Sequence, residues 1–273
     1  MQQTPVPTTS PVEIAEETFL IPNLAAADPG TYVPVNAMLI RGEQPVIVDT
    51  GAPVHRDHWR EQVFSLVDPE DVRWLFLSHD DGDHTGGVQD VLELCPNATI
   101  VGTFFLTERL SLEMPVPIER MVWVGPGETL DVGDRRLRLV VPPIFDGPTT
   151  RALFDERTEV LWAVDSFAAM TNGAVHEVED VPADLYDETF TLFNSMISPW
   201  HQWLDPERYD RHVDAVQALR PAAVASAHGP ILRGAAIDDA FDRVRTLAGN
   251  PIVPTPGQEL LDELIAGLVA VPA

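Results

Sequence analysis

The segment His79-Asp80-Asp81-Gly82-Asp83-His84 restricts the fold of this chain more than any other feature. A short apolar stretch at residues 73–78 precedes it and predicts a buried strand, and Gly86-Gly87 predicts the start of a helix. Side chains able to bind metal alternate at 79, 81 and 83, with a further one at 84. Alternate side chains of an extended segment share one side, so the segment could present ligands to two metal ions. An acidic turn in which Asp83 caps the helix is the alternative interpretation.

The composition describes a folded protein with an acidic surface. Hydrophobic residues make up 45% of the 273 residues, and the formal net charge is -26. Such a surface repels phosphate backbones and anionic lipids, which argues against nucleic acid and membranes as partners. All 17 basic residues are arginine, so chemistry that requires a lysine is excluded. The single cysteine, Cys95, leaves no intrachain disulfide and no cysteine-based zinc motif.

The distribution of polar and apolar residues predicts one cytoplasmic domain. Residues 1–16 are rich in Pro and Thr and carry neither the basic nor the apolar segment of a signal peptide, so we expect a flexible lead-in. No run of about 18 apolar residues, the length that spans a bilayer, is present. Residues 17–273 contain no linker, repeat or charge block and are predicted to form a single domain.

The order of the predicted elements favours two mixed halves. Strands are expected within residues 17–24, 32–41, 45–49, 73–78, 99–102, 121–145 and 222–227, and a hairpin at 152–165 that turns near 155–158. Helices are expected around Trp59, Val63 and Leu66, around Val91 and Leu94, and near 184–193, 206–219, 237–247 and 259–268. A β-rich stretch followed by a βα unit, repeated once, is typical of two packed sheets with helices on their outer faces.

The motif resembles the signature of the metallo-β-lactamase superfamily, H-x-H-x-D-H between a strand and a helix. The segment Val48-Asp49-Thr50-Gly51 resembles the early motif of that family, whose aspartate supports the metal loop. Asp81 replaces the second histidine, which is similar to the flavodiiron and oxygen-binding di-iron branch with its acidic residue, usually Glu, at this position. The resemblance covers roughly residues 17–248 and implies an α/β fold, an αββα sandwich of two mixed β-sheets packed face to face. The length of the chain leads us to expect no flavodoxin domain in it.

Three later segments complete the ligand set that the resemblance implies. Asp146 stands where the di-iron branch has a further histidine, Asp165 aligns with a bridging aspartate, and His228 aligns with the last ligand. Taken singly, Asp146 could be a turn residue and His228 a hydrogen-bonded histidine at a strand end. The implied set is His79, Asp81, Asp146 and bridging Asp165 at one metal, and Asp83, His84, Asp165 and His228 at the other.

The donor atoms of this set indicate the cofactor and its chemistry. All are nitrogen or oxygen, and carboxylate oxygens favour the harder cations, so we expect two metal ions, with iron favoured and zinc or manganese as alternatives. The resemblance implies a cluster that binds or reduces dioxygen or a related small oxidant, helped by a separate redox partner. The alternatives are a hydrolase that attacks an ester, lactone or phosphodiester with a metal-bridging hydroxide, and a non-catalytic O₂ sensor. A small-molecule substrate and a homodimer are compatible with each.

Two groups of residues outside the motifs are further candidates. His201 lies in the aromatic segment Ser198-Pro199-Trp200-His201-Gln202-Trp203, and such loops often carry functional residues, so it is a candidate for lining the pocket. Packing between the tryptophans is the alternative. Phe104, Phe105, Phe167 and Met170 would form either an apolar access channel or part of the core.

Overall fold

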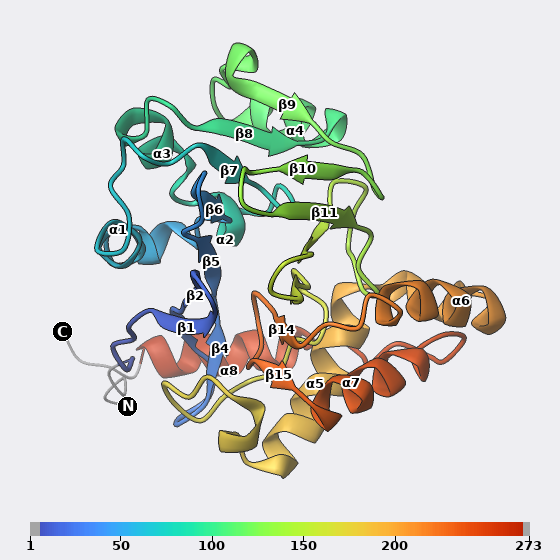
Figure 1. The fold of residues 1–273 in the computed structure, drawn as a ribbon. Coiled ribbons are helices and arrows are strands. Elements are labelled where there is room, and N and C mark those ends of the chain that lie inside the picture. Colours follow the sequence, from blue (N-terminus) through green and yellow to red (C-terminus); the bar gives the residue numbers. More distant parts are fainter. Residues whose placement is uncertain (1–5, 270–273) are drawn as a thin grey trace.

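Two mixed β-sheets dominate the computed structural model, which describes residues 6–269 (Figure 1). The larger sheet has the strand order β1-β2-β5-β6-β7-β8-β9 and the smaller one β10-β11-β12-β13-β14-β15, while β3 and β4 pair separately. The strands of the larger sheet are β1 Val12–Ala15, β2 Thr18–Ile21, β5 Ala37–Ile40, β6 Val46–Val48, β7 Trp74–Phe76, β8 Thr99–Gly102 and β9 Met121–Trp123. Those of the smaller sheet are β10 Thr129–Asp131, β11 Arg136–Val140, β12 Ala152–Asp155, β13 Val160–Trp162, β14 Ala223–Ala225 and β15 Leu232–Arg233, and the separate pair is β3 Leu24–Ala26 and β4 Tyr32–Pro34.

Helices cover the outer sides of the two sheets, with α1 and α3 on one side and α5, α6 and α7 on the other (Figure 1). The α-helices are α1 Arg56–Phe64, α2 Gly82–Thr85, α3 Val88–Leu94, α4 Phe104–Glu113, α5 Ala183–Ile197, α6 Pro206–Gln217, α7 Ala235–Arg245 and α8 Gln258–Val269. Short 3-10 turns lie at Pro53–His55, Ile118–Arg120, Val178–Asp180 and Pro199–Trp203. None of the helices described is long and apolar enough to cross a membrane. The cytoplasmic location stays a prediction.

Successive apolar side chains of the central strands point to opposite faces of the sheet, which explains why the two sheets stack. In β5, Met38 and Ile40 belong to the core shared with the second sheet, while Ala37 and Leu39 belong to the core under α1, α3 and α4. A strand whose two faces are both apolar must be covered on both sides, by a sheet on one face and helices on the other. The αββα sandwich expected from the sequence is therefore confirmed.

The secondary structure differs from the expectation at three places. Strand β1 lies inside the stretch predicted as a flexible lead-in, because Val12 and Glu13 pair with Leu20 and Phe19 of β2. The extended segment 32–41 is divided into β4 and β5, and helix α4 was not predicted. Thr103 caps α4 by accepting a hydrogen bond from the Leu106 N–H.

The topology brings the ends of two parallel strand pairs to one place. Strands β6 and β7 run parallel in the larger sheet, and β13 and β14 run parallel in the smaller one. The segments with Asp49 and His79 follow the first pair, and those with Asp165 and His228 follow the second. Side chains beyond the carboxyl ends of parallel strands converge, as in other open α/β sheets that bind ligands there.

Candidate metal centre

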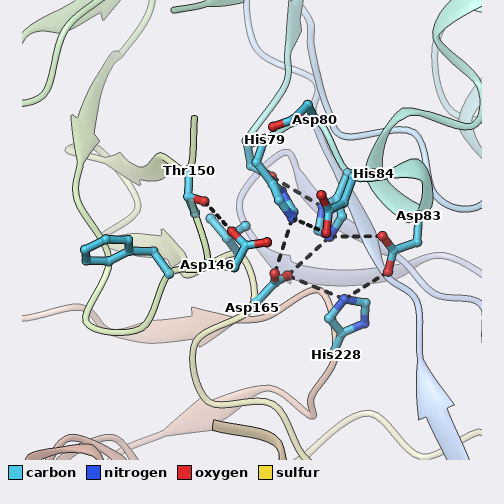
Figure 2. Close-up of polar contacts among 12 residues, drawn as sticks. His79, Asp80, Asp83, His84, Asp146, Thr150, Asp165 and His228 are labelled. Atoms are coloured by element: carbon cyan, nitrogen blue, oxygen red, sulfur yellow. Dashed lines mark hydrogen bonds and ion pairs between the residues drawn. The ribbon is translucent and has the colours of Figure 1, made fainter. Parts of the chain in front are cut away.

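Seven side chains from four segments meet between the carboxyl ends of these strands (Figure 2). The side chains form three groups, and within each group the donor atoms all lie within 4.8 Å of one another. The groups are His79 with His84 and Asp165, Asp83 with His84 and His228, and His79 with Asp81 and Asp146. The residues predicted as ligands from the sequence are all in these groups. Their role as ligands stays a proposal.

Asp165 lies at the middle of the cluster. Its Oδ2 is 3.3 Å from His79 Nε2, while its Oδ1 is 3.2 Å from His84 Nε2 and 3.4 Å from His228 Nε2. Metal–ligand bonds of about 2.1 Å place neighbouring donor atoms roughly 3.0–3.4 Å apart in tetrahedral or octahedral coordination. The distances around Asp165 therefore fit a carboxylate that binds one metal ion through each oxygen.

Three buried atoms in the cluster lack a hydrogen-bond partner: His79 Nε2, His84 Nε2 and Asp165 Oδ1. A buried polar atom without a partner costs about 1–3 kcal/mol, so several of them facing one another need an explanation. The side chains of His79 and His84 are each 1% exposed. Metal ions bound between these atoms would satisfy all three, and the residues present fit such a cofactor.

Two histidines donate hydrogen bonds from Nδ1, and these bonds orient their Nε2 atoms toward the cluster. His84 Nδ1 lies 3.0 Å from Asp49 Oδ2, and His228 Nδ1 lies 2.8 Å from the Pro34 carbonyl oxygen. Because these oxygens can only accept, each Nδ1 carries the proton and donates, which leaves the Nε2 lone pair free for a metal ion. Asp49 therefore braces the segment that carries Ser78 and His84, and its support of a metal site stays a prediction.

The electrostatics of the cluster favour a positive charge at its centre. Burial opposes an imidazolium at His84, yet the carboxylates of Asp165 and Asp49 outweigh this cost and raise its pKa well above the usual range. Burial likewise opposes ionisation of Asp165, but His79 and His84 hold its pKa well below the usual range. A metal ion bound here would supply the positive charge that a proton on His84 otherwise supplies.

The loop after Asp49 fixes the segment that carries His84. Thr50 donates from its N–H and its hydroxyl to the His84 carbonyl, at 2.7 Å and 2.9 Å, and its Oγ1 accepts from the Gly87 N–H. The Gly86 N–H donates to the Gly51 carbonyl at 2.8 Å. This approach of two backbones requires a residue without a side chain at position 86.

Replacing Gly86 with alanine is expected to lower the free energy of unfolding by about 1–3 kcal/mol. The new Cβ would lie 2.6 Å from the Gly51 carbonyl oxygen, so the backbone must shift. The change is measured by urea denaturation. Gly82→Ala is the matched control, because a Cβ at position 82 meets no atom within 4 Å. Equal stability of the two variants would contradict the proposed close approach.

Strained backbone surrounds Asp165. Val164 and Phe167 adopt positive φ angles of 57° and 66°, which are rare for a β-branched or bulky residue. Asn194 of α5 stabilises this bend, because its Oδ1 accepts from the Phe167 N–H at 2.8 Å and its Nδ2 donates to the Ala168 carbonyl at 3.0 Å. The sequence did not single out Asn194, since no local pattern distinguishes a buried asparagine on a helix.

Asn36, a second residue absent from the sequence-based predictions, braces the loop of His228. Its Nδ2 donates to the carbonyls of Ser226 at 2.9 Å and Gly229 at 3.1 Å, and its backbone N–H donates to the Ala227 carbonyl at 2.8 Å. Asn36 is separated from these residues by 190 to 193 positions. A contact of this kind gives no signal in a single sequence.

The carboxylates at the outer side of the cluster are more exposed. The side chain of Asp81 is 52% exposed, and burial of the remainder is the main cause that raises its pKa. Asp146 is exposed, and its Oδ1 accepts a hydrogen bond of 2.9 Å from the Thr150 hydroxyl (Figure 2).

The neighbouring residue Asp80 connects two other segments, because its carboxylate accepts from the Arg109 guanidinium at 3.1 Å and from the Thr149 hydroxyl at 2.6 Å. Asp80 thus holds α4 against the segment of Asp146.

The structure places His201, a candidate for lining the pocket, outside the cluster. Its ring is 1% exposed, Nδ1 lies 2.7 Å from the Leu247 carbonyl oxygen, and Nε2 lies 3.1 Å from Ser195 Oγ. Both ring nitrogens are engaged, so His201 joins α5 to the segment after α7. Phe104 and Phe105 are each 49% exposed on α4, whereas Phe167 is buried in the core.

The αββα sandwich with a His/Asp cluster at the strand ends defines a metallo-β-lactamase-fold domain with a candidate dinuclear centre. Residues 33–229 match the family described as "ODP family beta lactamase". The chain belongs to this family. It is 31% identical to the putative diflavin flavoprotein A 1 of Nostoc sp. over 202 residues, which are 72% of this chain and 33% of that protein.

Solved structures of flavodiiron proteins share the fold. The flavodiiron protein from Giardia intestinalis superposes with a TM-score of 0.75 at 17% identity, over 88% of this chain and 59% of that one. The rubredoxin oxygen:oxidoreductase from Desulfovibrio gigas gives a TM-score of 0.74 at 17% identity, over 87% of this chain and 61% of that one. The chain spans about a third of the length of curated diflavin flavoprotein relatives that it matches in sequence.

Proposed function

We propose that this chain is a non-haem di-iron protein that binds or reduces dioxygen or a related small oxidant. The position of Asp165 carries the proposal, because one of its oxygens lies within 3.4 Å of His79 and the other within 3.4 Å of His84 and His228. A carboxylate shared in this way holds two metal ions close enough to act on one small molecule. The names of the relatives, flavodiiron proteins and an oxygen oxidoreductase, support the same chemistry.

The donor set supports iron over zinc. It contains four carboxylates and three imidazoles, and oxygen-rich sets favour harder cations. Four negative charges neutralise two divalent ions, which leaves less positive charge for activating a hydroxide than a histidine-rich zinc site would have. Two bound iron ions would supply one electron each to an oxidant.

The residues of the chain hold and orient these ions. Asp49 and Pro34 fix the histidine rings, while the exposed Asp81 and Asp146 lie on the side that a small molecule can reach from solvent. Reduction of dioxygen to water takes four electrons and two iron ions supply two. A separate redox partner that delivers the remaining electrons is therefore part of the proposal.

The test is metal content combined with oxygen consumption. Protein expressed in iron-replete medium is expected to contain two iron ions per chain, to show a visible ferric absorption band, and to consume O₂ when a chemical reductant is supplied. Zinc as the only metal, together with turnover of an ester, lactone or phosphodiester, would overturn the proposal and favour a hydrolase. Bound iron that takes up O₂ without turnover would favour the sensor.

A further inference from the structure

We infer that the two metal positions are unequal, one binding its ion tightly and the other holding an ion that exchanges with solvent. The inner position consists of Asp83, His84 and His228, and the outer position of His79, Asp81 and Asp146, with Asp165 shared between them. The inference rests on the proposed function only in using the same residues as ligands. It concerns the relative affinities of the two positions, whichever reaction the cluster performs.

The donor atoms differ between the positions. With Asp165 included, the inner position offers two imidazoles and two carboxylates, whereas the outer one offers one imidazole and three carboxylates. Imidazole suits iron and zinc, while a set dominated by carboxylates suits magnesium, calcium and manganese. For iron, the donor types alone therefore favour the inner position.

The spacing of the donor atoms is similar at the two positions. At the inner position, His228 Nε2 lies 3.2 Å from Asp83 Oδ2, close to the separation of neighbouring ligands on one ion, while His84 Nε2 lies 3.9 Å from Asp83 Oδ1. At the outer position, His79 Nε2 lies 3.8 Å from Asp81 Oδ2. One aspartate at each position must therefore move inward to bind an ion, so the inequality rests on the donor types and on the exposure of the ligands.

Exposure and support of the ligands also separate the two positions. At the inner position, the His84 and His228 side chains are 1% and 12% exposed and are held by Asp49 and by the Pro34 carbonyl, and Asp83 is 39% exposed. At the outer position, His79 is as buried as His84, so the difference lies in the carboxylates. Asp81 is 52% exposed, and its carboxylate accepts no hydrogen bond from the residues described. An exposed, unsupported side chain loses water and rotational freedom when it binds, and both losses weaken the outer position.

The backbone that carries Asp146 is nevertheless fixed. Phe145 donates its N–H to Ser198 Oγ at 3.1 Å, and its carbonyl accepts from the Ser198 hydroxyl at 2.6 Å and from Trp200 Nε1 at 2.8 Å. The weakness of the outer position therefore arises from the side chains, and replacing one side chain can change it.

Anaerobic titration of the metal-depleted protein with Fe(II), followed by calorimetry and by equilibrium dialysis, tests the inference. We expect two separate steps, the second with a dissociation constant at least about tenfold larger than the first. Asp146→His, which replaces a carboxylate with an imidazole, is expected to tighten the second step about tenfold or more and to leave the first within about threefold. Anomalous scattering from crystals with one equivalent of Fe(II) is expected to place the ion at the inner position.

Asp184→His is the matched control, because Asp184 is exposed on α5 and the change adds a histidine outside the cluster. If Asp146→His fails to fold, Asp81→Glu serves instead, since one added methylene brings the carboxylate toward His79. Two steps of equal affinity, or a first ion at the outer position, would overturn the inference. Unequal steps observed with zinc while iron does not bind would overturn the di-iron proposal and leave this inference standing.

Discussion

Asp165→Asn is expected to reduce metal binding from two ions per chain to at most one. Asparagine keeps the size of the side chain, but it removes the charge and one of the two oxygens that face His79 and His84. Loss of a residue that only supports a ligand costs about 10–100-fold in metal affinity, and a shared ligand should cost more. Metal content after dialysis, and the shift in melting temperature on adding metal, measure the effect.

Asp90→Asn is the control for the general loss of a buried carboxylate. The Asp90 side chain is 5% exposed and pairs with Arg56, and Asp90 is not one of the residues of the cluster. Its replacement is expected to lower stability and to preserve two ions per chain. Two tightly bound ions in the Asp165→Asn protein would refute the bridging role.

Asp49→Asn is expected to destabilise the fold by about 2–4 kcal/mol and to weaken metal binding 10–100-fold. Asp49 is fully buried, and its Oδ2 accepts from the Ser78 hydroxyl at 2.6 Å, His84 Nδ1 at 3.0 Å and Trp162 Nε1 at 3.1 Å, while Oδ1 accepts from the Ser78 N–H at 2.7 Å. An amide places an NH₂ group against at least one of these donors. Even with its oxygen toward His84 Nδ1, the amide is an uncharged and weaker acceptor, so it holds the His84 ring less firmly with Nε2 unprotonated.

Two measurements separate the effects of this variant. Urea denaturation in the presence of a chelator gives the stability change, and titration with Fe(II) gives the change in affinity. Trp162→Phe is the comparison, since it removes one donor to Asp49 without touching His84. We expect it to lose stability and keep its metal affinity. A similar loss of affinity in both variants would argue against the orienting role of Asp49.

The sequence predicted the fold and the candidate ligands well where the signal was local. The hairpin at 152–165 appears as β12 and β13, and the strand at 99–102 as β8. The residues expected as ligands meet in one cluster because each stands just beyond a strand or in the loop that follows it, where a short motif is visible. The match to the ODP family agrees with the resemblance noted in those motifs.

The elements and the residue that the sequence did not predict correctly have two physical causes: a weak local pattern, or contacts with distant residues. Helix α4 was not predicted because its apolar residues, Phe104 and Phe105 among them, are partly exposed and give no clear amphipathic period. Strand β1 was not predicted because it is a short edge strand whose pairing with β2 depends on a partner rather than on its own residues. His201 resembled a functional loop residue, but its contacts with Leu247 and Ser195 are tertiary.

The sequence alone determined which donor types are available, their order along the chain and the strands that present them, because these depend on neighbouring residues. Only the tertiary structure decided which histidine nitrogen faces the cluster, how close the oxygens of Asp165 lie to the three histidines, and which candidate ligands are buried or exposed. Those properties arise from contacts such as Asp49 with Trp162 and His228 with Pro34, which join segments more than 100 residues apart. Contacts of that range depend on the packing of both sheets at once, and no single segment encodes them.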